Sequence, residues 1–304
     1  MASEARWVRV RREAIAAYAN RIGEVAPPAQ LDPEFHYHGA TAADTATFVL
    51  TLGAINFGSG YFPHLRRRDQ RSGYFHVARA LKERFERGVP PAAELAALTV
   101  PQVAEIFGQP LEQPIAELMT LFGAALNAFG RHLLERWEGR AEVMVRAAGG
   151  SAERLAGLLA EVPFFDDVHS YRGRSVPIYK RAQIAPADLS LALEGQGLGR
   201  FDDLERLTIF ADNLVPHVLR LDGVVEFDPV LEERIERGEL LVSGAADEVE
   251  MRACAIHAVE LLAGELRDQG RPRTAMALDH VLWNRGQGPD YKARPRPRCR
   301  SVYY

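Results

Sequence analysis

The sequence predicts a mainly α protein with a little extended structure in its middle. Apolar residues recur at helical spacing in most long segments, and prolines or glycines close those segments. The middle of the chain, residues 164–201, is less regular. The chain has 304 residues, 47% hydrophobic and 26% charged, which is ordinary for a soluble globular protein. Because no linker divides it, we expect one compact unit over residues 1–304, with helical subdivisions near 1–160 and 161–304.

The first expected helix covers residues 3–25. It ends at Pro27 and Pro28, because proline lacks the amide that a helix needs. One face of this helix carries its larger apolar side chains at a spacing close to 3.6 residues, namely Trp7, Val10, Ala14, Tyr18 and Ile22.

A second helix is expected to begin at Thr41. Asp44 follows three residues later, so the pair resembles a capping box with aspartate in place of glutamate. This helix reaches Asn56, and glycines follow at positions 58 and 60. Gly58 and Gly60 favour a sharp turn or a close approach of the backbone to another group.

Four further helices are expected before the irregular middle. Residues 73–87 form one of them, and residues 111–138 form a long apolar helix that crosses the core. Thr99 and Gln102 make a fuller capping box at the start of a third helix. Ser151 opens a short fourth helix.

The rest of the chain alternates between irregular and helical patterns. Residues 171–184 alternate in polarity and contain Pro177, which predicts extended or irregular structure. Residues 224–227 read as a short strand. Helices are then expected from Pro229, over 247–267 and over 274–284.

The apolar stretch over residues 207–222 contains one carboxylate, Asp212. Burying a carboxylate is costly unless it has partners or a chemical task. Pro216 follows four residues later and should stop a clean helix, so Asp212 is expected at the end of a short helix or at a kink between two. Such a break aims a side chain into a cavity, but aspartate is also a common helix cap. Catalysis and capping are therefore both open for Asp212.

A second polar constellation lies on the expected helix 274–284. His280 and Asn284 share one face of that helix, and Asp279 lies on the neighbouring face with Trp283. A carboxylate beside donors and acceptors suits the polar edge of a nucleobase, where it can accept two N–H bonds. The alternative is that these residues only mark the border between the polar and apolar faces of an amphipathic helix, without a ligand.

Several classes of protein are not indicated by the sequence. The start of the chain does not resemble a signal peptide, and no window reaches the roughly 18 apolar residues of a membrane span, so we expect a cytoplasmic protein without a membrane partner. Cys254 and Cys299 are too far apart to form a CxxC motif. His36 and His38 lack a third ligand nearby, so we expect no metal and no other cofactor. Phosphate-loop, GxSxG, GxGxxG and kinase motifs do not occur.

The net charge of −4 is unevenly distributed. Residues 271–304 carry +6, which leaves −10 for the rest of the chain. An acidic body with a basic end does not suit bulk nucleic-acid binding, and no stable nucleic-acid partner is expected. The basic end, together with the adjacent pair Lys180 and Arg181, could instead hold one phosphate group. A solvated basic tail is the alternative.

The chain resembles the queuosine salvage family, the queuosine 5′-phosphate N-glycosylase/hydrolases. The residues that carry the resemblance span most of the chain in the same order, and each motif alone is weak. They are residues 55–61 (INFGSGY), 180–184 (KRAQI), 207–212 (LTIFAD) with Val215 and Pro216, Leu278 and Asp279 with Leu282 and Trp283, and the end 300–304 (RSVYY).

The resemblance implies a compact multi-helix fold similar to that of DNA glycosylases. It also implies cleavage of the N-glycosidic bond of queuosine 5′-monophosphate, a small-molecule substrate, with release of the base queuine. The family's catalytic aspartate corresponds to Asp212 and its base-stacking aromatic residue to Phe210. Its base-contacting positions correspond to Asp279, His280, Asn284 and His38. Two departures are Asn213-Leu214, where the family more often has an aromatic-basic pair, and His280 with Asn284, where it often has a tyrosine and an acid.

The residue types suit this chemistry without the resemblance. Breaking the C1′–N bond builds positive charge on the ribose and negative charge on the base, so a carboxylate near C1′ and donors near the base both help. Two alternatives remain. A glycosylase-like protein could bind a modified base in nucleic acid, and its affinity would then fall steeply with salt. In a non-catalytic helical module, Asp212 would only cap a helix.

Overall fold

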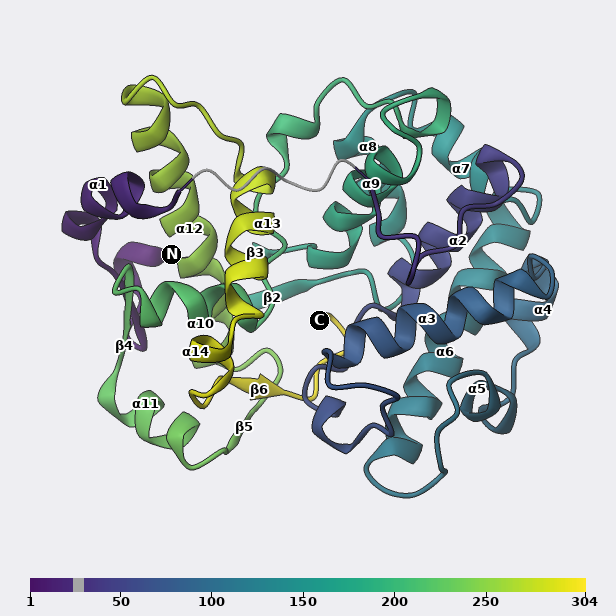
Figure 1. Cartoon of the computed structure of the whole chain (residues 1–304), viewed down its shortest axis with the longest axis horizontal. Coiled ribbons are helices and arrows are strands. Elements are labelled where there is room, and N and C mark those ends of the chain that lie inside the picture. The colour runs from purple at the N-terminus through teal and green to yellow at the C-terminus, as the bar shows by residue number, and fades with distance from the viewer. Residues whose placement is uncertain (24–29) are drawn as a thin grey trace. The chain divides into compact units, whose positions relative to one another are not determined.

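The computed structural model describes residues 1–23 and 30–304, and it is mainly α, as predicted (Figure 1). The chain divides into two compact units, each assembled from separate segments. Unit 1 contains Met1–Pro28, Asp167–Lys180 and Glu205–Arg300. Unit 2 contains Ala29–Asp166, Arg181–Leu204 and Ser301–Tyr304. The end of residue range 3–25 and both Pro27 and Pro28 lie outside the described residues.

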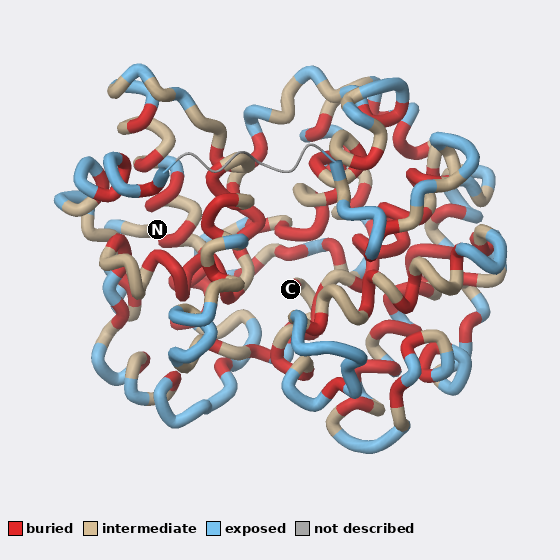
Figure 2. Tube along the Cα trace, in the orientation of Figure 1, coloured by how far each residue is buried: buried red, intermediate tan, exposed pale blue. Residues whose placement is uncertain are grey.

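Unit 2 is built from helices around the long helix α6 (Ile115–Arg136), against which α2, α4 and α5 pack. Fully buried apolar side chains such as Phe122 and Phe129 follow one side of α6. Many of the exposed positions along the chain trace lie in connecting loops (Figure 2). The other elements of this unit are α2 (Ala42–Ile55), η2 (Phe62–His64), α3 (Gly73–Glu86), α4 (Ala92–Ala97), α5 (Val100–Ile106), α7 (Ala141–Ala147), α8 (Ala152–Ala160), η3 (Gly197–Gly199) and most of α9 (Lys180–Ala192).

The helix N-termini that were predicted from capping residues are found in the structure. Thr41 and Asp44 form a reciprocal capping box on α2, and Thr99 donates its backbone N–H to Gln102 Oε1 at the start of α5. Ser151 caps α8. Gly58 follows α2 with φ of +99°, a conformation that glycine adopts without strain, and its N–H donates to the carbonyl of Tyr304.

Unit 1 combines helices with short paired strands. Its long helix α12 (Ala246–Asp268) packs against α1 (Arg12–Arg21), α10 (Leu214–Leu221) and α13 (Ala275–Gly286). The remaining elements are η1 (Ala2–Glu4), β1 (Val8–Val10), β2 (Val168–Tyr171), β3 (Arg174–Pro177), β4 (Val225–Phe227), α11 (Pro229–Glu236), β5 (Leu240–Leu241), α14 (Pro289–Lys292) and β6 (Arg298–Cys299). The 3-10 turn η4 (Leu204–Arg206) lies where the two units meet in sequence.

Three short ladders stabilise the extended segments of unit 1. β1 pairs with β4 antiparallel, with Val8 opposite Phe227. β2 and β3 form a hairpin, with Val168 opposite Pro177, and β5 pairs with β6 in parallel. The strand predicted over residues 224–227 is confirmed as β4, and extended structure in the range 171–184 is confirmed up to Pro177.

Several predictions of secondary structure are wrong. The expected helix over residues 3–25 begins only at Arg12, because the preceding amides of Arg6, Trp7 and Val8 donate to Glu250 Oε2 at 2.7, 2.5 and 3.2 Å and so leave the helical path. The irregular structure expected after Pro177 becomes helix α9 from Lys180 onward. The long helix α6 also begins at Ile115 rather than at residue 111.

Candidate active site

Asp212 lies directly before helix α10, at the end of a segment that is neither helix nor strand. The helix expected before it is absent, and Pro216 does not break α10 but occupies its first turn. At that position the missing N–H would have no partner inside the helix in any case. Asp212 Oδ1 accepts hydrogen bonds from the backbone N–H groups of Leu214 at 2.7 Å and Val215 at 3.2 Å.

The capping and catalytic interpretations of Asp212 are compatible. Oδ1 caps α10 and is placed where the helix dipole favours negative charge. Oδ2 forms no hydrogen bond to the residues that the structure describes, and the residue is only half-buried. One carboxylate oxygen therefore fixes the side chain, and the other is available for chemistry.

Phe210, which was predicted to stack on the base, and Asp279, which was predicted to contact its polar edge, lie together. The backbone N–H of Phe210 donates to Asp279 Oδ1 at 2.9 Å, and both residues are buried. Asp279 projects from helix α13. This bond occupies one oxygen of the carboxylate that was predicted to read the base edge. The ring of Phe210 is 3% exposed, so stacking on a base would need the ring to be uncovered.

The close packing of α10 against α13 depends on Gly286. A Cβ at this position would lie 2.8 Å from Leu214 Cγ and 2.9 Å from Val218 Cγ2, both on α10. These separations are shorter than carbon atoms tolerate, so glycine allows the two helices to approach. The helix that starts beside Asp212 and the helix that carries Asp279 are thereby brought together.

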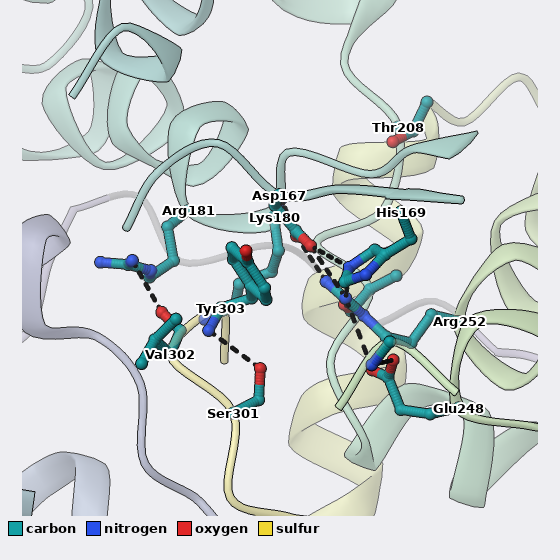
Figure 3. A network of polar contacts seen from close by, with 12 residues as sticks. Asp167, His169, Lys180, Arg181, Thr208, Glu248, Arg252, Ser301, Val302 and Tyr303 are labelled. Carbon is teal, nitrogen blue, oxygen red and sulfur yellow. Dashed lines mark hydrogen bonds and ion pairs between the residues drawn. The ribbon is translucent and has the colours of Figure 1, made fainter. Parts of the chain in front are cut away.

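A buried ionic network that the sequence interpretation missed supports the same segment (Figure 3). Arg252 on α12 donates from Nε to the carbonyl of Ala211 at 2.8 Å, and its two terminal nitrogens reach the two oxygens of Asp167 at 2.9 and 2.5 Å. His169 Nε2 lies 2.8 Å from Asp167 Oδ1. Glu248 Oε1 lies 3.5 Å from Arg252 Nη1.

The charge of Arg252 controls the ionisation of Asp167. Burial alone would raise the pKa of Asp167, but the charge of Arg252 and hydrogen bonds from His169, Arg252 and the backbone N–H of Lys180 outweigh burial. The pKa of Asp167 therefore lies well below its usual range, and the pair stays ionised at neutral pH. One sequence signal could have identified Arg252. It lies three residues from both Val249 and Ala255, so it interrupts a buried apolar face.

His280 and Asn284 lie on α13 beyond Asp279. His280 is half-buried, and burial lowers the pKa of its imidazole, so the ring is neutral at pH 7. Its Nδ1 is buried and has no hydrogen-bond partner among the described residues. Asn284 is exposed. A neutral imidazole can accept at one nitrogen and donate at the other, which suits the mixed edge of a nucleobase.

The candidate phosphate ligands differ from each other. Lys180 is buried at the start of α9, and its backbone N–H donates to Asp167 Oδ2 at 3.1 Å. Arg181 is 1% exposed, and its guanidinium donates to four carbonyls, those of Gly53 at 3.0 Å, Ala54 at 2.7 Å, Val302 at 2.7 Å and Phe164 (Figure 3 shows the bond to Val302). These bonds would have to break before Arg181 could bind an anion, so its surroundings do not support the predicted phosphate role.

His38 belongs to unit 2 and is exposed, in the segment before α2. Within the described part of the chain, no three His, Cys, Asp or Glu side chains are grouped closely enough to hold a metal ion. Among residues 1–23 and 30–304, no helix has the length and apolar composition of a membrane span.

Comparison with known proteins identifies one family. Residues 35–304 match the family described as queuosine salvage protein. A protein of Sphaerobacter thermophilus named queuosine 5′-phosphate N-glycosylase/hydrolase is 36% identical over 99% of this chain and 94% of its own length. Mouse and Dictyostelium discoideum proteins with the same name are 34% and 32% identical, over 77% and 86% of this chain and 72% and 78% of their own lengths. The chain therefore belongs to the queuosine salvage protein family.

Proposed function

We propose that this protein hydrolyses the N-glycosidic bond of queuosine 5′-monophosphate and releases the 7-deazaguanine base queuine. Three relatives named queuosine 5′-phosphate N-glycosylase/hydrolase align with most of the chain, which supports this activity. In the reaction the bond between C1′ and the base nitrogen breaks, water supplies a hydroxyl to C1′, and the base leaves with a proton.

Asp212 is the carboxylate that stabilises the positive charge on the ribose as the bond breaks. The observation that carries this assignment is the difference in hydrogen bonding between its two carboxylate oxygens. Oδ1 is fixed by the amides of Leu214 and Val215, and Oδ2 is not hydrogen-bonded within the described residues. A carboxylate whose orientation is fixed in advance stabilises a developing cation without a reorganisation cost. It can act by attack on C1′ or by activation of water.

The remaining site residues act on the base and the phosphate in this proposal. Phe210 stacks on the flat ring system once substrate binding has uncovered its ring, and Asp279, His280 and Asn284 contact the polar edge of the base. The contact of His38 with the base stays a prediction from the family resemblance alone, because His38 belongs to unit 2. Lys180 is retained as a candidate for the 5′-phosphate.

The test is incubation with queuosine 5′-monophosphate and detection of free queuine by mass spectrometry. The wild-type chain should release queuine equally well with and without a chelator. Asp212→Asn preserves the size of the side chain and an oxygen that can cap α10, but it removes the negative charge. We expect kcat to fall about 10³-fold or more with little change in the thermal unfolding midpoint. Near-normal turnover by a folded Asp212→Asn protein would refute the assignment.

A further inference from the structure

The backbone on the N-terminal side of Asp212 is held by a buried charged side chain. Arg252 Nε donates to the carbonyl of Ala211 at 2.8 Å, and Arg252 is 0% exposed. The segment that contains Ala211 has no helical or strand hydrogen bonds, so this carbonyl depends on a side chain for a partner. A buried guanidinium is costly to maintain, and an apolar residue would fill the same space without that cost.

Asp167 fixes the orientation of the Arg252 guanidinium. The two terminal nitrogens of Arg252 pair with the two oxygens of Asp167, at 2.9 and 2.5 Å. The planar fork of the guanidinium then leaves Nε pointing at Ala211. Asp167 is itself held by His169 at 2.8 Å and by the backbone N–H of Lys180 at 3.1 Å. The orientation of one carbonyl therefore rests on a connected network of buried polar groups (Figure 3).

The groups around Asp212 are fixed on both sides of it in sequence. Before it, Asp279 holds the N–H of Phe210 at 2.9 Å, and Arg252 holds the carbonyl of Ala211. After it, Asn213 Nδ2 donates to the carbonyl of Pro297 at 2.7 Å. All of these partners are in unit 1. The peptide bond between Ala211 and Asp212 consequently has one orientation, and this orientation sets the direction in which the Asp212 side chain projects.

We propose that Arg252, oriented by Asp167, is a positioning residue for Asp212. This inference rests on the proposed function, because it presumes that Asp212 faces the reacting carbon. Arg252 does not touch the substrate in this proposal. It acts by holding the Ala211 carbonyl, so that Asp212 Oδ2 needs no reorganisation when the substrate binds. Misplacement of a catalytic group by about 1 Å can lower a rate about 100-fold.

The test is Arg252→Lys in the full chain, with queuosine 5′-monophosphate as substrate. Lysine keeps the positive charge near Asp167, but it lacks the fork that reaches Asp167 and Ala211 together. We expect kcat per folded molecule to fall about 100-fold, with KM changed by less than about threefold. Hydrogen exchange of the peptide 208–215 should become faster. Where Arg252→Lys does not fold, Asp167→Asn tests the same network and should lower kcat in the same direction.

Glu250→Gln is the matched control. Glu250 is on the same helix, is 1% exposed, and binds the backbone N–H of Trp7 and the hydroxyl of Tyr171 rather than residues 210–212. This variant should lower the unfolding midpoint but leave kcat and the exchange of 208–215 within about twofold of wild type. An equal loss of kcat in Glu250→Gln would show that any buried charge change on α12 has this effect, and it would overturn the positioning role.

The outcomes separate this inference from the proposed function. If wild type releases no queuine, the proposed function fails. If wild type is active and Asp212→Asn is inactive, but folded Arg252→Lys keeps its kcat and its slow exchange at 208–215, only the positioning role of Arg252 fails.

Discussion

Arg252 in unit 1 and Arg181 in unit 2 are both buried arginines that donate to backbone carbonyls, but they support different kinds of structure. Arg252 pairs with the carboxylate of Asp167 and donates from Nε to one carbonyl, that of Ala211. Arg181 donates to four carbonyls and lies 4.7 Å from the ring centroid of Phe165. The first arrangement orients one peptide group beside a carboxylate, whereas the second joins several chain segments.

Arg181 supplies donors to carbonyls at the ends of the segments that it joins. Gly53 and Ala54 are in the last turn of α2, where carbonyls lack the usual i+4 partner within the helix, although the Gly53 carbonyl also accepts from the N–H of Asn56 at 3.5 Å. Phe164 has φ of +77°, a left-handed conformation that costs a side-chain-bearing residue about 1–3 kcal/mol. A buried arginine can thus serve the stability of a unit or the geometry of a site, and its partners distinguish the two roles.

The largest effect on stability is expected for Arg181→Lys. An ammonium group has three donors at one point and cannot reach four carbonyls, so buried acceptors are left unsatisfied. We expect the free energy of unfolding to fall by about 4 kcal/mol, measured by urea denaturation. In contrast to Arg252→Lys, kcat per folded molecule should stay within about twofold of wild type.

The result for Arg181→Lys can contradict the comparison in two ways. A raised KM for the nucleotide, with an unchanged KM for the nucleoside, would support the phosphate role predicted from the sequence. A fall in kcat without a loss of stability would mean that Arg181 acts on the site and not on the folding of unit 2.

The contrast between the two arginines also marks what the sequence could predict. Capping boxes at Thr41 and Thr99 and the mainly α fold follow from patterns within a few residues, and they are confirmed. Arg181 could be singled out because Lys180 adjoins it, but its partners are far away in sequence. Arg252 and Asp167 are 85 residues apart, so no local pattern reveals the pair.

Asp212 also shows that a local sequence pattern cannot reveal contacts with residues distant in the chain. Its place in an apolar stretch identified it as unusual, and its capping of α10 follows from residue type. The loss of the expected preceding helix depends on contacts with residues 41 and 69 positions away, namely Arg252 to Ala211 and Asp279 to Phe210. These contacts hold the segment in an open conformation that its own sequence does not specify.

Acid should destabilise the Asp212 region through His217, whereas Arg181 keeps its charge at every relevant pH. His217 is fully buried on α10, and burial lowers its pKa to about 4 despite a hydrogen bond to the carbonyl of Tyr291. The unfolded chain, with a histidine pKa of about 6.5, binds the proton first as the pH falls. The stability contributed by neutral His217 is therefore complete above about pH 6.5 and is lost toward pH 4, by up to about 3 kcal/mol.

The measurement is the free energy of unfolding at pH 7, 6, 5 and 4 for wild type and His217→Gln. Glutamine can donate to the Tyr291 carbonyl but does not titrate, so other histidines contribute equally to both proteins. The difference between the two curves should change as the pH falls from about 6.5 toward 4, and it should stay constant with pH if His217 does not titrate in this window. Parallel curves would therefore contradict the assigned pKa.

The smallest loss of stability among these predictions is expected for Gly286→Ala. Unlike Arg181→Lys in unit 2, this change in unit 1 should lower kcat as well as stability. The added methyl group would meet Leu214 and Val218, so α13 and α10 must separate by a few tenths of an ångström. We expect a loss of about 2 kcal/mol in unfolding free energy. Because α10 begins at Leu214, whose N–H binds Asp212, kcat should also fall by about tenfold. Gly264→Ala on α12, where a Cβ would lie 3.8 Å from its nearest neighbour, is the control and should leave kcat unchanged.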